Sequence, residues 1–391
     1  MCVRDDGGHG CEPLAETSAG LETLASVCWA GYVASILGGR PLSPKSVEVS
    51  CARPYAGCLL GLVLAVSPLA IHGQTCTTQA RMSDGVRNDL SGAAMNLAQS
   101  IKDGNAARVQ AVTIAEFASA SSFAPTASVV QTTAPKLAGD SLRVTQIYQL
   151  DARERKPGDT SEADFSCALS GTTSETDFSI SGLPPGLYGF AMVEADGPRP
   201  WLLSFLLRQD SGVWKLAGFY PRERTIAGHD GVWYWTSARA DVKAKELWLA
   251  WVLYGTADVL LRPANFVTST NLDRMRAEQT AAAPPELING LGPEMPLVIK
   301  VVGRNGSPAS YSFTSIVGEG SEDGRQLKLV LHFSADYIAD PTAAKARNLA
   351  AASALLDAHR DLRQDFDSVW VFADSAGHEP LLTQQPLSAI P

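Results

Sequence analysis

The chain has 391 residues, of which 45% are apolar and 19% are charged, and its formal net charge is −9. This is the composition of a globular protein with room for two or three domains of roughly 100–200 residues each, and it excludes collagen, a coiled coil and wholesale disorder. The acidic balance argues against a nucleic-acid partner, because a phosphate-binding surface needs a cluster of basic residues and the chain has none.

An apolar run from Ala56 to Ile71 follows Arg53 and precedes Gly73. A basic residue, a short apolar segment and a small residue in this order are typical of a secretory signal peptide. We therefore expect residues 1–73 to be a leader, in which residues 1–50 are an upstream extension, and the mature protein to be periplasmic or secreted. In the alternative, the apolar segment stays uncleaved, and the chain then contacts the membrane only through this segment.

If the mature chain begins at Gln74, two of the seven cysteines remain, Cys76 and Cys167. In an oxidising compartment an even pair predicts a disulfide, and the alternative is two buried thiols. The sequence contains no P-loop, no C-x-x-C and no H-E-x-x-H pattern, so we expect neither a cofactor nor a metal.

Hydrophobic periodicity predicts helices first and strands afterwards in the N-terminal half of the mature chain. The helices are expected over Asp84–Lys102 and Ala107–Ala118, and residues 119–140 are expected to be mostly loop. The strands are expected over Ser141–Leu150, Ala163–Leu169, Thr176–Ile180, Gly186–Ala195, Pro200–Gln209 and Gly212–Tyr220.

The last two of these strands, Trp201 to Tyr220, combine an apolar strand, a short polar turn and a W-K-x-x-G-F/Y strand. This segment resembles the closing hairpin of the NTF2-like (cystatin-like α+β) superfamily, and the resemblance extends over residues 84–225. It implies a curved antiparallel sheet around an N-terminal helix, with a pocket inside. It implies no particular reaction, because this fold serves many functions.

Alternation along the strands predicts which residues line that pocket. Tyr188, Phe190, Met192 and Glu194 fall on one side of their strand, and Trp214 and Tyr220 are expected to share a face two strands further on. These six residues are the predicted ligand-binding site. A carboxylate among aromatic rings can serve as a general base, so Glu194 carries the alternative of an enzyme; its place beside a turn favours an ordinary solvated carboxylate.

Residues 226–285 are predicted to connect two domains. Trp233, Tyr234 and Trp235 stand in a polar and aromatic loop, followed by one helix over Ala238–Leu261. Such an aromatic cluster either packs domains together, forms an interface with a partner or stacks a flat ligand, and we assign the three residues to an interface.

A linker over Ala281–Pro296 precedes the last domain, residues 294–388. Strands are expected over Leu297–Val302, Ser310–Gly318, Gln326–Phe333, Ser368–Ala373 and Leu381–Leu387, and a helix from Asp340-Pro341 to about Leu362. This βββαββ order predicts one helix on an antiparallel sheet. His332 is expected on the surface, His359 near the end of the helix and His378 in a turn.

The fold class is therefore α+β, with an NTF2-like sheet, a helical connector and a small second domain. The stretches Gly228–Trp235 and Asp367–Pro380 resemble two-domain secreted proteins of acidobacteria, which implies a compartment and no activity. We expect an exported, non-catalytic protein of the cell envelope that binds a small apolar ligand or an envelope protein. The alternatives are an isomerase-type or dehydratase-type enzyme that transfers protons in the pocket, and a structural subunit of an envelope assembly.

Overall fold

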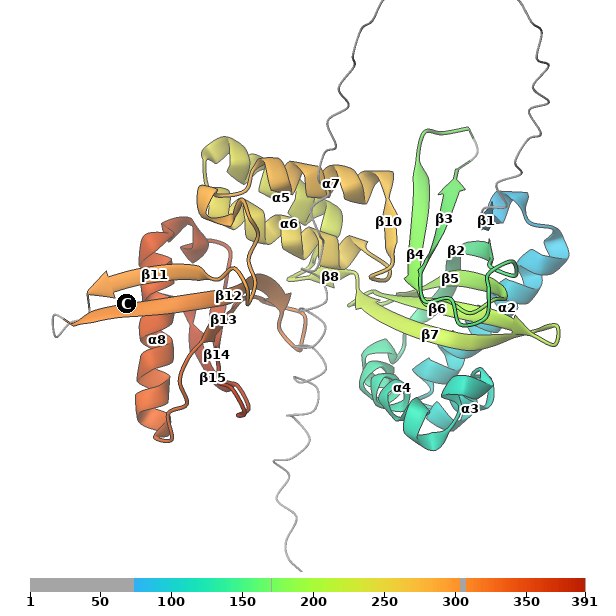
Figure 1. Ribbon diagram of the computed structural model, residues 1–391, viewed down its shortest axis with the longest axis horizontal. Coiled ribbons are helices and arrows are strands. Elements are labelled where there is room, and N and C mark those ends of the chain that lie inside the picture. The colour runs from blue at the N-terminus through green and yellow to red at the C-terminus, as the bar shows by residue number, and fades with distance from the viewer. Residues whose placement is uncertain (1–73, 170, 303–306, 391) are drawn as a thin grey trace, which may run out of the picture. The chain divides into compact units, whose positions relative to one another are not determined.

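The computed structural model of the chain describes residues 74–169, 171–302 and 307–390. The predicted leader, residues 1–73, lies outside the described residues. The described part is a mixed α+β structure with several antiparallel sheets, as predicted (Figure 1).

The N-terminal helices begin with α2 (Asp84–Lys102), over the predicted range. The Ser83 hydroxyl accepts the backbone N–H of Val86 and caps this helix, which buries Leu90 and Ile101. The short helix α3 (Ala106–Ala111) follows. The prediction that residues 119–140 are mostly loop is wrong, because helix α4 (Ala120–Thr133) lies there. This segment combines alanine, a strong helix former, with a Ser119 cap and a buried side formed by Phe123 and Val130, which together outweigh its serines and threonines.

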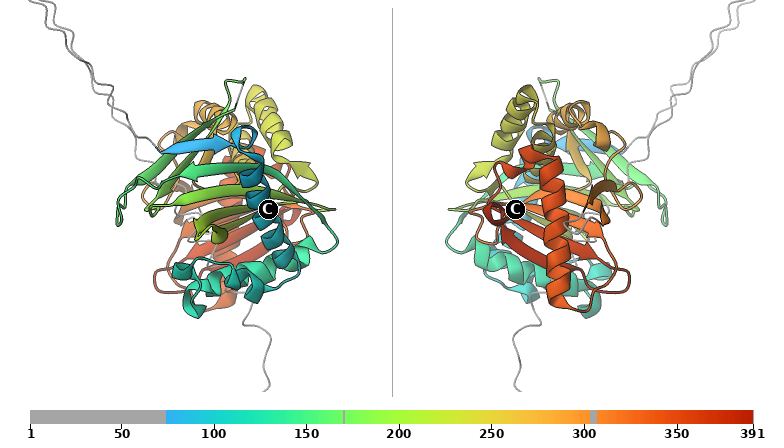
Figure 2. Two further views of the ribbon diagram at one scale, coloured as in Figure 1. Left: turned by 90° about the vertical axis from the view of Figure 1, so that its right-hand side faces the viewer. Right: turned by 90° about the vertical axis from the view of Figure 1, so that its left-hand side faces the viewer.

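Five strands form the first sheet, in the order β1-β2-β5-β6-β7, and every neighbouring pair is antiparallel. They are β1 (Thr75–Thr78), β2 (Ser141–Asp151), β5 (Leu187–Asp196), β6 (Trp201–Asp210) and β7 (Val213–Glu223). Helix α2 packs on one face of this sheet and shares a core with it (Figure 2, left). Gly189 on β5 permits the close approach, because a Cβ atom there would lie 2.4 Å from the Leu90 side chain.

A second sheet, in the order β10-β4-β3, covers the other face of the first. It consists of β3 (Glu162–Ala168), β4 (Glu175–Ser181) and β10 (Val267–Ser269). Aromatic rings fill the space between the sheets, with Phe178 edge-on to both Tyr148 and Phe190 at centroid distances of 5.2 Å. Cys76 of β1 and Cys167 of β3 form a disulfide with a Cα–Cα distance of 5.3 Å, so a covalent bond joins the two sheets.

The connecting segment is more helical than predicted. A short pair of strands, β8 (Thr225–Ile226) and β9 (His229–Asp230), precedes α5 (Gly231–Ala244) and α6 (Leu247–Leu261), and α7 (Thr270–Ala281) follows β10. The prediction of a loop followed by one helix is wrong. The Asp230 carboxylate caps α5 by accepting the N–H of Trp233, and Lys245 ends the helix with a φ of 70°.

The C-terminal part has the predicted βββαββ order. Its elements are β11 (Leu297–Val302), β12 (Pro308–Gly320), β13 (Leu327–Ser334), α8 (Pro341–Ala358), β14 (Ser368–Asp374) and β15 (Leu381–Pro386). Helix α8 lies against one face of this sheet (Figure 2, right). The expectation of a wholly antiparallel sheet is wrong, because β13 and β14 are parallel neighbours joined through α8 as a crossover.

Helices α5 to α7 and the C-terminal sheet share one hydrophobic core. The predicted linker contributes to it, because Leu287 and Leu291 are buried there. None of the helices in the described part of the chain combines the length and apolar character needed to cross a membrane.

Candidate functional site

The structure separates the six residues predicted to line one pocket. Tyr188 and Phe190 are buried between the two sheets, where Met192 and Tyr220 pack against them. Trp214 belongs to the core that contains α2. The expectation that Trp214 and Tyr220 share a face is wrong because β7 contains a β-bulge. Its register with β6 shifts near the middle, and the extra residue turns the following side chains to the opposite face.

A small cavity remains beside this aromatic core. Phe190 and Met192 line it together with Thr176, Thr268 and Leu272, and its volume is about 100 Å³. Pockets that bind drug-sized ligands measure roughly 300–1,000 Å³. Two of the six predicted residues therefore line a space well below the size of such pockets.

Glu194, the predicted general base, is held by two arginines. One carboxylate oxygen forms an ion pair with Arg143 of β2, and the other forms an ion pair with Arg224, which follows β7. The Glu194 side chain is 14% exposed. Both oxygens are engaged by arginines, so this geometry favours a structural role.

The three aromatic residues predicted as an interface lie on α5 and point in different directions, because successive helix residues are about 100° apart. Trp233 is 40% exposed and stacks on His229 with ring centroids 3.7 Å apart. Tyr234 is buried and donates a hydrogen bond to the backbone oxygen of Ile226. Trp235 is half-buried, and its Nε1 donates to Glu278 at 2.8 Å. Of the three, Trp233 alone is exposed.

A histidine and an aspartate meet at the carboxyl ends of β13 and β14. His332 Nδ1 lies 3.2 and 3.3 Å from the two oxygens of Asp374, and its ring stacks on Phe372 with centroids 4.6 Å apart. When Nδ1–H donates to the carboxylate, Nε2 is left as an acceptor. Asp374 was not predicted as a partner of His332, because the two residues meet only through the parallel pairing of β13 with β14. The strand–helix–strand order was the available signal, since parallel neighbours need such a crossover.

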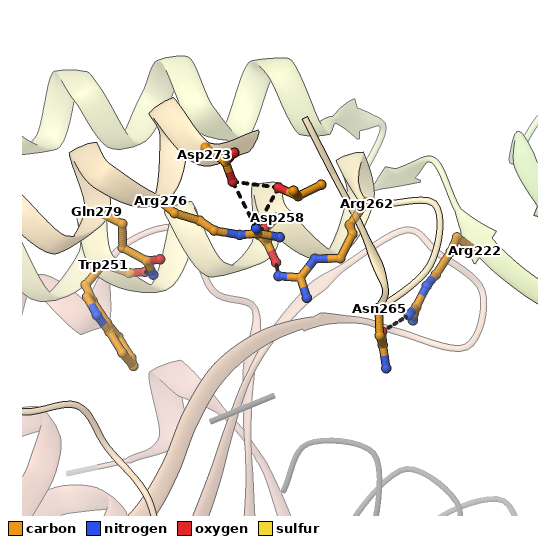
Figure 3. A network of polar contacts seen from close by, with 9 residues as sticks. Arg222, Trp251, Asp258, Arg262, Asn265, Asp273, Arg276 and Gln279 are labelled. Carbon is orange, nitrogen blue, oxygen red and sulfur yellow. Dashed lines mark hydrogen bonds and ion pairs between the residues drawn. The ribbon is translucent and has the colours of Figure 1, made fainter. Parts of the chain in front are cut away.

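A third cluster, formed mainly by arginines and aspartates, links α6, α7 and β7, and we call it the arginine network (Figure 3). Asp258 of α6 forms ion pairs with Arg262 at the end of that helix and with Arg276 of α7, the second at 3.0 Å. Arg276 also contacts Asp273 at 3.4 Å. On β7, Arg222 donates to the Asn265 side chain at 3.0 Å.

The electrostatics of this network are unusual for arginine. Burial, followed by the nearby positive charge of Arg262, lowers the pKa of Arg222 to about 10. Burial also lowers the pKa of Arg262, against the opposing effect of Asp258. The side chains of Arg262 and Asp258 are only 14% and 13% exposed. The network therefore holds partly desolvated cations close to one another, an arrangement that attracts anions.

Elsewhere among the described residues, no three His, Cys, Asp or Glu side chains gather closely enough to hold a metal ion. Acidic residues do meet at the end of α5. Burial, followed by the negative charges of Asp365, Glu246 and Asp361, raises the pKa of Asp241 to about 6. Asp241 Oδ2 is buried and has no hydrogen-bond partner in the described part of the chain.

We expect Asp241→Asn to stabilise the protein at pH 8. The folded pKa of Asp241 lies above its unfolded value of about 3.9, so the folded state binds the proton more tightly. The stabilisation that the folded state gains by binding this proton more tightly is fully present below the unfolded pKa, and it is lost as the pH rises through about 6. Because the residue is half-buried, we expect a gain of about 1 kcal/mol at pH 8.

Urea denaturation at pH 5 and pH 8 measures this effect. The stability advantage of the Asp241→Asn variant should shrink at the lower pH, whereas Asp89→Asn, which alters an exposed carboxylate on α2, should give no such pH dependence. An advantage that is equal at both pH values would contradict the expected titration of Asp241.

No family model matches the chain, and no curated protein and no solved structure matches it either.

Proposed function

We propose that the chain is an exported, non-catalytic binding protein of the bacterial cell envelope, which recognises a ligand or an envelope protein at its surface. The observation that carries this proposal is the arginine network, where half-buried cations lie beside the exposed residue Asn265. The interior offers less support for ligand binding, since the cavity beside Phe190 and Met192 holds about 100 Å³.

We also propose that residues 84–225 form an NTF2-like domain. The antiparallel sheet β1-β2-β5-β6-β7 with α2 packed on one face supports this proposal. In this domain the packing of α2 against Ala191, Val193 and Phe205 fills the concave side with buried side chains. Binding at the surface is consistent with such a filled interior.

Export is supported by the Cys76–Cys167 disulfide, because disulfides persist in oxidising compartments and are rare in the cytosol. The enzyme alternative, proton transfer by Glu194, is disfavoured by its two ion pairs. A structural subunit of an envelope assembly is equally consistent with the filled interior. It differs from the proposed binding protein because it needs no ligand.

Native mass spectrometry of the full-length product, expressed for export to a bacterial periplasm, tests the proposal. We expect a mature chain that begins near Gln74, contains one disulfide and carries a non-covalent ligand or protein partner. An uncleaved leader would contradict export. A cleaved chain that assembles only with itself and carries no other molecule would favour the structural subunit over the binding protein.

A further inference from the structure

Strand β11 is an outer strand of the C-terminal sheet, and no strand in the described part of the chain pairs with its free edge (Figure 1). Its six residues, Leu297–Val302, include no proline and no acidic side chain, and Lys300 is the one charged residue among them. Val298 and Val302 are 44% and 76% exposed. A long, apolar and exposed edge is a template for pairing with another strand, and proteins usually protect such edges.

The other outer strands of the described residues are better protected than β11. Strands β1, β8, β9 and β10 have only two to four residues. On β3, Glu162 and Asp164 are exposed charges. Thr113 bridges to part of the β7 edge, and on β15 the Asn348 side chain donates to the backbone oxygen of Leu381 at 2.9 Å. Strand β11 is therefore the edge most open to another strand.

The backbone groups that β11 offers follow from its register with β12. Val302 pairs with Pro308, and proline has no N–H to donate. Opposite residues of antiparallel strands alternate between hydrogen-bonded and non-hydrogen-bonded pairs, so Val302 and Pro308 form a non-hydrogen-bonded pair. The N–H and C=O groups of Val298, Lys300 and Val302 therefore point away from β12. They form the row of donors and acceptors that an added strand needs.

We infer that β11 pairs with β11 of a second copy of the chain, antiparallel and about a two-fold axis at Ile299. This contact joins two five-stranded sheets into one continuous sheet. Val298 then lies opposite the partner's Lys300, and the two residues exchange both of their outward hydrogen bonds. The half-buried Ile299 meets its own counterpart at the axis and loses further contact with water.

Charge and proline favour this register of a strand with itself. Centred at Lys300, the pairing would place two lysines opposite each other, and like charges at opposite positions destabilise a sheet. Centred at Val298, it would place Lys300 opposite Pro296, which has no N–H. The register at Ile299 avoids both conflicts, so the edge is complementary to itself. The inference goes beyond the proposed binding function and does not rest on it.

Sedimentation equilibrium of the purified, exported protein over a series of micromolar concentrations tests this contact. We expect a reversible monomer–dimer equilibrium, with residues 297–302 better protected from hydrogen exchange in the dimer. Lys300→Pro removes an outward N–H that β12 does not use, so it should weaken dimerisation at least tenfold. Circular dichroism checks that this variant stays folded.

Two charge variants test the register and do not depend on the tolerance of a proline. Val298→Glu places a carboxylate opposite the partner's Lys300 at two symmetric positions, so it should tighten dimerisation severalfold at low salt. Val298→Lys places like charges there and should weaken it severalfold. Val213→Glu is the matched control, because Val213 is an exposed valine on β7 and its replacement changes the net charge equally. Its dissociation constant should stay within twofold of the original.

A protein that stays monomeric at every concentration would overturn the inference. So would a dimer that Lys300→Pro leaves intact, and equal dissociation constants for Val298→Glu and Val298→Lys would overturn the register at Ile299. The native mass spectrum separates this contact from the proposed function. A monomer that carries a ligand or another protein would keep the binding function and reject the contact, whereas a dimer without any other molecule would keep the contact and favour the structural subunit.

Discussion

Replacing both Cys76 and Cys167 with alanine is expected to lower the free energy of unfolding by about 4 kcal/mol. The two residues are 91 positions apart, so the disulfide closes a long loop and restricts the unfolded chain strongly. The bond also joins β1 of the first sheet to β3 of the second, across the aromatic core. Its loss should therefore weaken the attachment of the second sheet first.

Guanidinium denaturation with and without reductant measures this contribution. Reductant should destabilise the original protein and leave the double alanine variant unchanged. A single Cys76→Ala variant should resemble the double variant, because either change removes the bond. If reductant shifts the original protein by less than 1 kcal/mol, the disulfide does not constrain the unfolded chain as expected.

The elements with strong local signals could be predicted from the sequence. Helix α2 has a Ser83 cap and regularly spaced apolar residues, and its range is as predicted. The strands β5, β6 and β7 are separated by Asp-Gly and Ser-Gly turns, which predict consecutive antiparallel neighbours. Their order and antiparallel pairing are confirmed. Asp340 followed by Pro341 marked the start of α8 correctly.

The predictions that were wrong concern features that depend on tertiary strand pairing. The bulge in β7 places Trp214 and Tyr220 on opposite faces, and Gly218 beside it was the available signal, because a glycine inside a strand often marks a bulge. The parallel pairing of β13 with β14 places Asp374 near His332, although the sequence predicted only strands. Alternation assigns residues to a face but does not say which sheet or helix covers that face.

The arginine network shows the same limit for the candidate site. Asp258 and Arg262 are four residues apart on α6, which is a readable helix pair. Arg222 and Arg276 come from β7 and α7, and their proximity to that pair follows only from the packing of the described residues. The aromatic residues 233–235 were predicted as an interface because they form a cluster in the sequence. In the helix they point in different directions, and only Trp233 is exposed.

Arg155→Met is expected to lower the free energy of unfolding by about 3 kcal/mol. The Arg155 side chain is 3% exposed and donates to backbone oxygens of both the β2–β3 connection and the β4–β5 connection. The acceptors are the carbonyls of Leu183, Glu162, Asp159 and Ser161. Methionine fills part of the volume but supplies none of these donors, and it also removes the ion pair of Arg155 with Asp159 at 3.5 Å. The Ser161 oxygen keeps the N–H of Gly182 at 3.2 Å, whereas acceptors that lose their donor on burial are costly.

Urea denaturation of Arg155→Met measures this cost, and two further variants separate charge from geometry. Arg155→Lys keeps the charge but cannot reach four carbonyls with one ammonium group, so its loss should be intermediate. Arg153→Met is the matched control, because Arg153 is 67% exposed and pairs with Asp151 at the surface, where a change of less than 1 kcal/mol is expected. A loss in Arg155→Met no larger than in the control would mean that water replaces the guanidinium at these carbonyls, and the two connections would then be held by their strands alone.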